Sequence, residues 1–129
     1  MKPDFLTLAE VLTLHEIQLR AYGGKDGLRD AGLLESAVAM PQATFGGVYL
    51  HPDLFAMSAA YAFHIAENQP FLDGNKRAGL HAALVFLDLN DFGAPDPLGR
   101  LYEAMLALSR RETNKDGLAK LLQELSKPR

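Results

Sequence analysis

The chain has 129 residues, with 13 Lys and Arg against 16 Asp and Glu, and a formal net charge of −3. This balance argues against a protein that binds nucleic acid directly through a broad basic face. The chain has no cysteine, which excludes disulfides, a thiol nucleophile and a thiolate zinc site. The N-terminus lacks the apolar region of a signal peptide, and no apolar run is long enough to cross a membrane. We therefore expect a cytoplasmic protein with a single domain over residues 1–129.

Helical apolar spacing covers the first 40 residues. The first expected helix begins after Thr7, which stands in capping-box spacing with Glu10, and it ends at Gly23-Gly24. A shorter helix is expected from Ala31 to Met40.

The next segment, residues 41–51, differs because aromatic and β-branched residues surround a pair of glycines. This pattern predicts a loop or short hairpin, which we call the flap. The flap comprises Phe45, Gly46, Gly47, Val48 and Tyr49.

Four further helices are expected after the flap, and the first of them is apolar nearly all round, as a buried central helix should be. Pro128 is expected to end the ordered part. The fold class is therefore all-α: a compact bundle of about six helices with one short non-helical flap. The four helices run from about Asp53 to Glu67, Asn75 to Leu89, Leu98 to Arg110 and Lys115 to Ser126.

A turn between the two central helices combines the groups that bind phosphate. Gly74 permits a tight turn, and the N–H groups that follow it have no intrahelical partner. The Asn75 amide can add a donor, while Lys76 and Arg77 add positive charge. Asp73 places a carboxylate beside them, a combination that suits Mg²⁺ because this ion bridges carboxylate and phosphate oxygens.

A purely structural interpretation competes with the phosphate site. Asp-Gly is a common turn, and Asn-Lys-Arg could be the solvated first turn of a helix. Lys76 and Arg77 would then oppose the helix dipole, a conflict that an anionic ligand would remove.

The stretch from Gln69 to Arg77 reads Gln-Pro-Phe-Leu-Asp-Gly-Asn-Lys-Arg. It resembles the core motif of the Fic/Doc family, His-Pro-Phe-x-Asp-Gly-Asn-Lys/Gly-Arg, at eight of nine positions. Likeness to the Doc ("death on curing") branch extends over nearly the whole chain, through Leu14-His15, residues 20–24, Leu33 to Ala37 and Phe45-Gly46-Gly47.

The resemblance implies a helical fold and the transfer of part of a nucleotide triphosphate to a hydroxyl of a target protein. ATP and Mg²⁺ are the implied cofactors, and elongation factor Tu is the target implied by the Doc branch. Asp73 would help to hold the metal or to orient the nucleophile. Gly74 and Asn75 would form an anion hole, and Lys76 and Arg77 would bind phosphates. The flap resembles the segment that docks the target by strand pairing.

The departure from the family is Gln69, where the motif has the His that acts as general base. An amide cannot accept a proton near neutral pH, and loss of general-base catalysis costs ~10²–10⁴-fold in rate. Gln69 could belong to a natural relative with changed chemistry, to a pseudo-enzyme that binds without transfer, or to a mutant form of an active toxin. His64, in an apolar helix, is expected to be structural rather than a substitute base.

Two function classes therefore remain open: a Doc-like transferase toxin impaired by Gln69, and a nucleotide- or peptide-binding module without transfer activity. No Glu has a Ser or Thr four residues before it, so the inhibitory Ser/Thr-x-x-x-Glu motif of some Fic proteins is missing. The resemblance then implies restraint by a separate antitoxin polypeptide.

Overall fold

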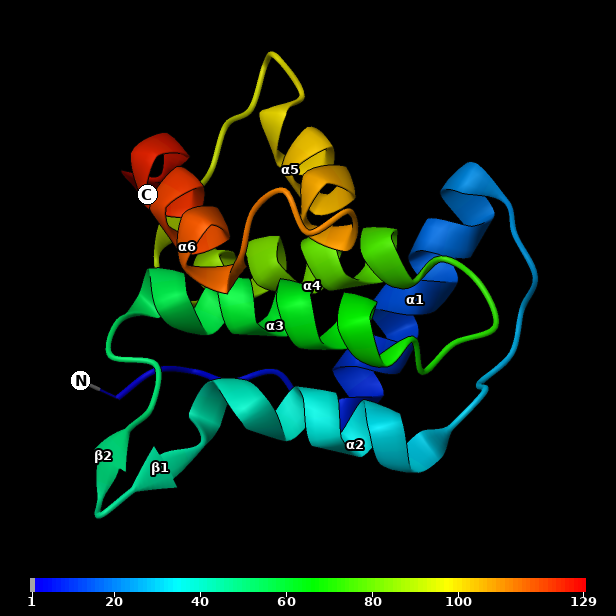
Figure 1. The fold of residues 1–129 in the computed structure, drawn as a ribbon, viewed down its shortest axis with the longest axis horizontal. Helices are drawn as coiled ribbons and strands as arrows, with labels where there is room; N and C mark the ends of the chain where they lie inside the picture. The colour runs from blue at the N-terminus through cyan, green and yellow to red at the C-terminus, as the bar shows by residue number, and fades with distance from the viewer. Residues whose placement is uncertain (1) are drawn as a thin grey trace.

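A computed structural model describes residues 2–129, in which six α-helices are joined by short loops and two pairs of very short strands (Figure 1). The elements in chain order are α1 Leu8–Tyr22, α2 Ala31–Ala39, a 3₁₀ turn Met40–Gln42, β1 Thr44–Phe45, β2 Val48–Tyr49, α3 Leu54–Asn68, α4 Asn75–Leu89, β3 Phe92–Gly93, α5 Arg100–Ser109, α6 Lys115–Leu125 and β4 Lys127–Pro128. The all-α prediction is thus confirmed.

Helices α3 and α4 form the centre of the fold, with α1 and α2 on one side and α5 and α6 on the other (Figure 1). Small side chains let the central pair approach closely: a Cβ added at Gly79 on α4 would lie 2.8 Å from the carbonyl oxygen of Ala62 on α3. Because a real Cβ essentially never comes that close, the packing of these two helices requires glycine at position 79.

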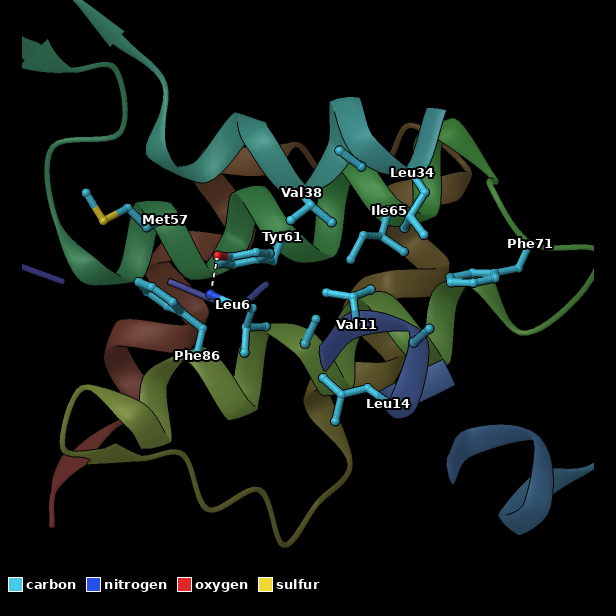
Figure 2. Close-up of a cluster of buried hydrophobic side chains, with 13 residues drawn as sticks. Leu6, Val11, Leu14, Leu34, Val38, Met57, Tyr61, Ile65, Phe71 and Phe86 are labelled. Atoms are coloured by element: carbon cyan, nitrogen blue, oxygen red, sulfur yellow. Dashed lines mark hydrogen bonds between the residues drawn. The ribbon is translucent and has the colours of Figure 1, made fainter. Parts of the chain in front are cut away.

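Two hydrophobic clusters share the central helices. The first, shown in Figure 2, joins α1 and α2 to α3 and α4 around Tyr61 and Phe86, whose ring centroids are 5.2 Å apart. The hydroxyl of Tyr61 accepts a hydrogen bond from the backbone N–H of Leu6 at 2.9 Å, which satisfies this buried oxygen. Burial raises the pKa of Tyr61 to about 12, so this hydroxyl stays neutral. The second cluster, around Leu87 and Met105, fixes α5 and α6 on the opposite side.

The helix boundaries follow local sequence signals. Thr7 and Glu10 form both hydrogen bonds of the predicted capping box at the start of α1. The predicted range of α4 matches the structure, while α3 begins one residue later than expected because Asp53 serves as its N-cap.

The second helix was expected to end at about Met40, and α2 ends one residue earlier, at Ala39, where a 3₁₀ turn that includes Pro41 follows. One expectation was wrong. Pro128 was expected to end the ordered part; instead, Lys127–Pro128 pairs with Phe92–Gly93 as an antiparallel ladder. Two-residue strands carry too little periodicity to be recognised from sequence.

No helix within residues 2–129 is long and apolar enough to cross a membrane.

Candidate functional site

The predicted phosphate-binding turn is the loop that joins α3 to α4, called here the motif loop (residues 69–74). Both of its ends adopt the left-handed region of backbone space: φ is 47° at Gln69 and 76° at Gly74. Glycine occupies this region without strain, whereas glutamine does so only when its surroundings hold it there.

A segment from the α1–α2 connection holds the motif loop in place. The backbone N–H groups of Arg29 and Asp30 both donate to the carbonyl of Pro70, and the N–H of Leu72 donates to the carbonyl of Gly27. The Arg29 side chain adds two bonds: its Nε donates to the Gln69 carbonyl at 2.7 Å, and its Nη2 donates to the Asn68 carbonyl at 2.9 Å. Arg29 therefore satisfies the last carbonyls of α3 and fixes the backbone at position 69.

Phe71 and His15 anchor the middle of the loop. Phe71 is buried, as predicted, and its ring stacks on the His15 ring with centroids 3.6 Å apart and planes 4° from parallel. His15 is also buried, and its Nε2–H donates to the carbonyl oxygen of Asp73 at 2.8 Å. His15 is buried and does not line the cavity over this loop, so it does not replace the proton acceptor missing at position 69.

Asn75 has a structural task that was not foreseen. Its side-chain amide exchanges two hydrogen bonds with the backbone of Phe71, each 3.0 Å long. The amide nitrogen carries a second N–H, so the predicted side-chain donation to an anion stays a prediction. The first i→i−4 bond of α4 is made by the N–H of Ala78, so the backbone N–H groups of residues 75–77 precede the helical ladder and are the donors offered to a ligand.

A cavity of about 480 Å³ opens over the motif loop and the N-terminus of α4. It is lined by all six predicted site residues: Gln69, Asp73, Gly74, Asn75, Lys76 and Arg77. A helix N-terminus with two cations in its first turn attracts anions, and the cavity has room for several phosphate groups. The structure therefore brings the six residues into one site.

Asp73 is exposed at the rim of this cavity. Its Oδ1 accepts the N–H of Gly74 at 2.8 Å, and its Oδ2 accepts the N–H of Lys25 at 3.3 Å. Each oxygen retains a second lone pair for a metal ion. Within residues 2–129, no group of three or more His, Cys, Asp or Glu could form a metal cage, but Mg²⁺ needs only one or two carboxylates when phosphate oxygens supply the rest. The residues present therefore fit Mg²⁺ held jointly with a nucleotide.

Two tyrosines that the sequence analysis missed flank Arg77. The Arg77 guanidinium carbon lies 3.7 Å from the ring centroid of Tyr22 and 4.3 Å from that of Tyr102. Both tyrosines also line the cavity. Stacking of this kind restricts the arginine side chain while leaving its N–H edge free to bind phosphate. No short motif marks the tyrosines, since Tyr22 ends α1 and Tyr102 lies on α5.

The flap forms the β1–β2 hairpin, with Thr44 paired to Tyr49 and Phe45 to Val48. It precedes the N-terminus of α3, whereas the motif loop follows the C-terminus, and Figure 1 shows the two at opposite ends of this helix. The 15 residues of α3 span about 22 Å. The structure therefore does not bring the flap into the cavity over the motif loop.

His64 belongs to a separate cluster with His51 and Lys115. Lys115 Nζ lies 3.0 Å from His51 Nε2 and 3.2 Å from His64 Nε2. Burial and the neighbouring Lys115 lower the pKa of His64 to about 4 and also lower the pKa of His51. As expected, His64 is held by structural contacts and does not line the cavity over the motif loop.

Comparison with known proteins agrees with the motif. The model of the Fic/DOC family matches residues 5–87. The chain is 37% identical over 118 residues to "Toxin Doc" from Mycolicibacterium smegmatis, covering 90% of this chain and 88% of that protein. It is also 37% identical over 81 residues to "Protein kinase doc" of Escherichia phage P1, covering 63% of this chain and 64% of the phage protein. The chain belongs to the Fic/Doc family, in its Doc branch.

Proposed function

We propose that this protein is a Doc-type toxin of a toxin–antitoxin module, which transfers phosphate from ATP to a hydroxyl of a target protein and so inhibits translation in the cytoplasm. The observation that carries the proposal is the single cavity that combines residue 69, the Asp73 carboxylate and the N-terminus of α4. The relative named "Protein kinase doc" supports transfer of phosphate over transfer of AMP. Elongation factor Tu is the target that we propose to test first.

The residues of the cavity have distinct tasks in this reaction. The N–H groups of residues 75–77 bind the oxygens of the transferred phosphoryl group, where negative charge is concentrated. Lys76 and Arg77 neutralise the remaining phosphates. Asp73 would hold Mg²⁺, which supplies charge neutralisation between phosphate groups when it is bound. The loop contacts through Arg29, Phe71 and His15 keep these groups in place before the nucleotide arrives.

Gln69 lies where the family's general base would stand. Its amide can accept a hydrogen bond from the target hydroxyl and orient it, but it cannot take the proton. Binding of ATP should therefore be intact, while transfer is slower by ~10²–10⁴-fold than with histidine at this position.

A second candidate function rests on the same observation. With the proton acceptor missing and the phosphate-binding groups present, the protein would serve as a nucleotide- or peptide-binding pseudo-enzyme. The two functions differ in one measurable property, which is whether any phosphate reaches a target.

The test compares the protein carrying Gln69 with the variant Gln69→His. Each protein is incubated with Mg²⁺, elongation factor Tu and ATP labelled at either the γ- or the α-phosphate. We expect γ-label on the target with Gln69→His and at least ~10²-fold less with Gln69. Label from the α-phosphate would instead identify AMP transfer.

Binding is measured separately, by titrating both forms and Arg77→Ala with ATP and Mg²⁺. Equal affinities of the two position-69 forms and a loss with Arg77→Ala are expected. If Gln69→His binds ATP but labels nothing, the pseudo-enzyme is favoured; if neither form binds ATP, the proposed nucleotide site is wrong.

Restraint of the toxin is proposed to come from a separate antitoxin polypeptide, because the chain lacks the inhibitory Ser/Thr-x-x-x-Glu sequence. An antitoxin segment that folds as a helix against the toxin would suit this arrangement.

A further inference from the structure

A smaller cavity, of about 160 Å³, adjoins the cavity over the motif loop and is called here the side cavity. The two cavities share Ala66, Gln69 and Lys76. The apolar lining of the side cavity includes Met105 and Leu108, which are buried on α5. Because Gln69 lines both cavities, a target hydroxyl held at position 69 borders the side cavity as well.

The side cavity contains a proton acceptor that has no task in the proposed transfer. Glu67 lines this cavity from the last turn of α3. Among the described residues that line either cavity, only Glu67 and Asp73 carry a carboxylate, and none is a histidine. Asp73 would hold Mg²⁺, and a carboxylate bound to a cation takes up a proton less readily. Glu67 is therefore the carboxylate that remains for the proton of the target hydroxyl.

An ion pair restrains Glu67 beside the side cavity. Arg111 Nη2 donates to Glu67 Oε1 at 2.6 Å, and Arg111 lines the same cavity. Arg111 follows α5 with a φ of 62°, in the left-handed region, and its N–H donates to the carbonyl of Leu108 at 3.2 Å. The ion pair engages Oε1 only, so Oε2 keeps its lone pairs for a proton. The side chains of Arg111 and Glu67 are 68% and 40% exposed, so water screens the arginine charge.

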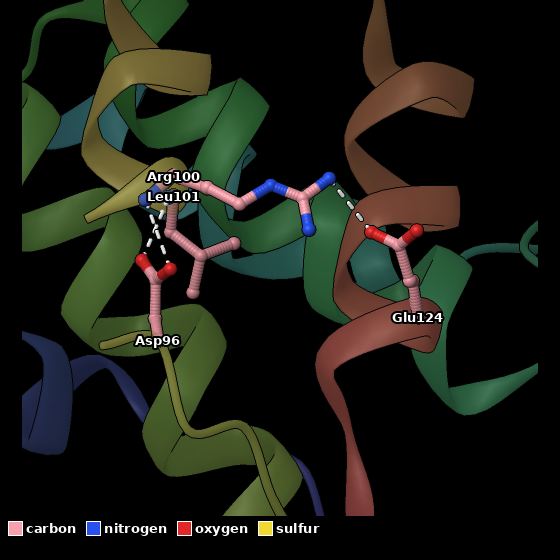
Figure 3. Close-up of polar contacts among 4 residues, drawn as sticks. All are labelled: Asp96, Arg100, Leu101 and Glu124. Carbon is pink, nitrogen blue, oxygen red and sulfur yellow. Dashed lines mark hydrogen bonds and ion pairs between the residues drawn. The ribbon is translucent and has the colours of Figure 1, made fainter. Parts of the chain in front are cut away.

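A comparable ion pair lies at the other end of α5. Arg100 Nη2 lies 2.8 Å from Glu124 Oε2 on α6, while Asp96 accepts the backbone N–H groups of Arg100 and Leu101 at the start of α5 (Figure 3). Neither Arg100 nor Glu124 lines either cavity. This second pair therefore supplies a matched control for a carboxylate that joins two elements without facing the site.

We propose that Glu67 is a catalytic residue, which accepts the proton of the target hydroxyl that Gln69 orients. This inference rests on the proposed function, because it concerns the same transfer. The Gln69 amide can donate an N–H to the hydroxyl oxygen. The hydroxyl's own proton is then free to reach Glu67, directly or through one water. A carboxylate performs this task in protein kinases.

The transfer then proceeds with Glu67 as the base. The hydroxyl oxygen bonds to the γ-phosphorus of ATP, and the bond from this phosphorus to the β,γ-bridging oxygen breaks. ADP leaves with the electron pair of the broken bond. The hydroxyl proton moves to the Glu67 carboxylate, which becomes a neutral acid and afterwards returns the proton to solvent.

The test asks whether Glu67 matters only when residue 69 cannot take a proton. Transfer of γ-label from ATP to elongation factor Tu is measured for Glu67→Gln in the protein carrying Gln69 and in the variant Gln69→His. With Gln69, transfer should fall roughly ten- to a hundredfold, because the remaining proton acceptor is lost. In the Gln69→His background it should fall by less than about twofold, because the histidine takes the proton.

Two further variants separate proton transfer from structure. Arg111→Met removes the ion pair and keeps the Glu67 carboxylate, so transfer with Gln69 should fall by less than about threefold. Glu124→Gln removes the carboxylate of the matched pair and should leave transfer unchanged. Thermal melts establish that each variant folds, and titrations with Mg²⁺-ATP should give unchanged affinities, because Glu67 does not line the phosphate cavity.

Equal losses from Glu67→Gln in the two position-69 backgrounds would overturn the inference, because a structural role does not depend on residue 69. A loss in Arg111→Met as large as that in Glu67→Gln would overturn it too, since the ion pair would then explain the effect. If the protein carrying Gln69 transfers nothing while Gln69→His labels the target, Glu67 is not a base and the proposed function stands. If Gln69→His labels nothing, the proposed transfer is wrong and this inference is wrong with it.

Discussion

The loops at the two ends of α3 differ in the number of contacts that hold them to the rest of the protein. At the C-terminal end, the motif loop is held by Arg29, by paired backbone bonds and by the buried Phe71–His15 stack. At the N-terminal end, the β1–β2 hairpin has only two residue pairs and leaves Phe45 81% and Val48 69% exposed. One end is fixed before any ligand arrives, whereas the other presents apolar surface to solvent.

This difference matches two different tasks. Transfer of a phosphoryl group requires donors that are already in position, because reorganising them during the reaction would cost rate. Recognition of a protein partner tolerates a loosely held element that gains order on contact, and exposed apolar side chains mark such places. We therefore propose that the motif end carries the chemistry and that the hairpin end contacts a partner.

The largest expected effect contrasts one phenylalanine from each end. Phe71→Ala should lower the free energy of unfolding by ~3–5 kcal/mol, because it removes a buried ring and leaves His15 without its stacking partner. Phe45→Ala should change it by less than ~0.5 kcal/mol, because the ring is exposed. Urea denaturation of both variants measures the difference; similar losses would contradict the contrast drawn between the two loops.

The next effect is the pH dependence of the free energy of unfolding. It depends on His51 and His64, which lie beside Lys115. His51 and His64 have folded-state pKa values below 6.5, first because of burial and then because of Lys115. Asp116 near His51 and Glu67 near His64 oppose this lowering without reversing it. At pH values well above 6.5 both histidines are mostly neutral in the folded and unfolded states and contribute little pH dependence.

As pH falls below 6.5, the unfolded chain binds protons that the folded chain does not, so stability should decrease. For His64 this decrease should continue to about pH 4, the folded pKa. Urea denaturation at pH 7.5, 6 and 5 measures the trend, and His64→Gln should reduce the slope. The same slope in both proteins would show that His64 does not contribute.

Much of the motif end could be predicted from sequence, because its signals are local. The range of α4 and the positive φ at Gly74 follow from a few neighbouring residues. The capping box at Thr7, at the start of α1, could be predicted for the same reason. The supports of the motif loop could not be predicted in this way. Arg29 reaches Gln69 across 40 positions of sequence, and the contact depends on how the α1–α2 connection folds back.

The tyrosines beside Arg77 escaped prediction for the same reason. Tyr22 and Tyr102 lie at the end of α1 and on α5, and only the packing of the bundle brings them to α4. The two hydrogen bonds between Asn75 and Phe71 also escaped prediction, because composition shows which groups are present and not which ones are already hydrogen-bonded.

A smaller effect tests whether the support of the motif loop matters for transfer. Arg29→Met, made in the Gln69→His background, removes both bonds from this side chain to the end of α3. We expect transfer to fall roughly ten- to a hundredfold, because position 69 loses its fixed geometry. ATP affinity should stay within about twofold, since Arg29 does not line the phosphate cavity.

The matched control is Arg129→Met, which breaks the exposed ion pair with Asp88 and should leave transfer unchanged. A parallel loss of ATP affinity and transfer in Arg29→Met would show that the loop has collapsed and that the effect is not one of positioning.

The smallest effect on the isolated protein, and the most informative about the hairpin, is expected from Phe45→Ser combined with Val48→Ser. Both side chains are largely exposed, so stability and ATP affinity should hardly change. In the Gln69→His background, labelling of elongation factor Tu should require a higher target concentration, because an apolar docking surface has been removed. The rate at saturating target should be preserved, since the hairpin is about 22 Å, the length of α3, from the motif loop. The opposite result would be a lower rate at saturating target with no change in the half-saturating target concentration. The hairpin would then contribute to the transfer step itself, and the proposed difference in task between the two ends of α3 would be wrong.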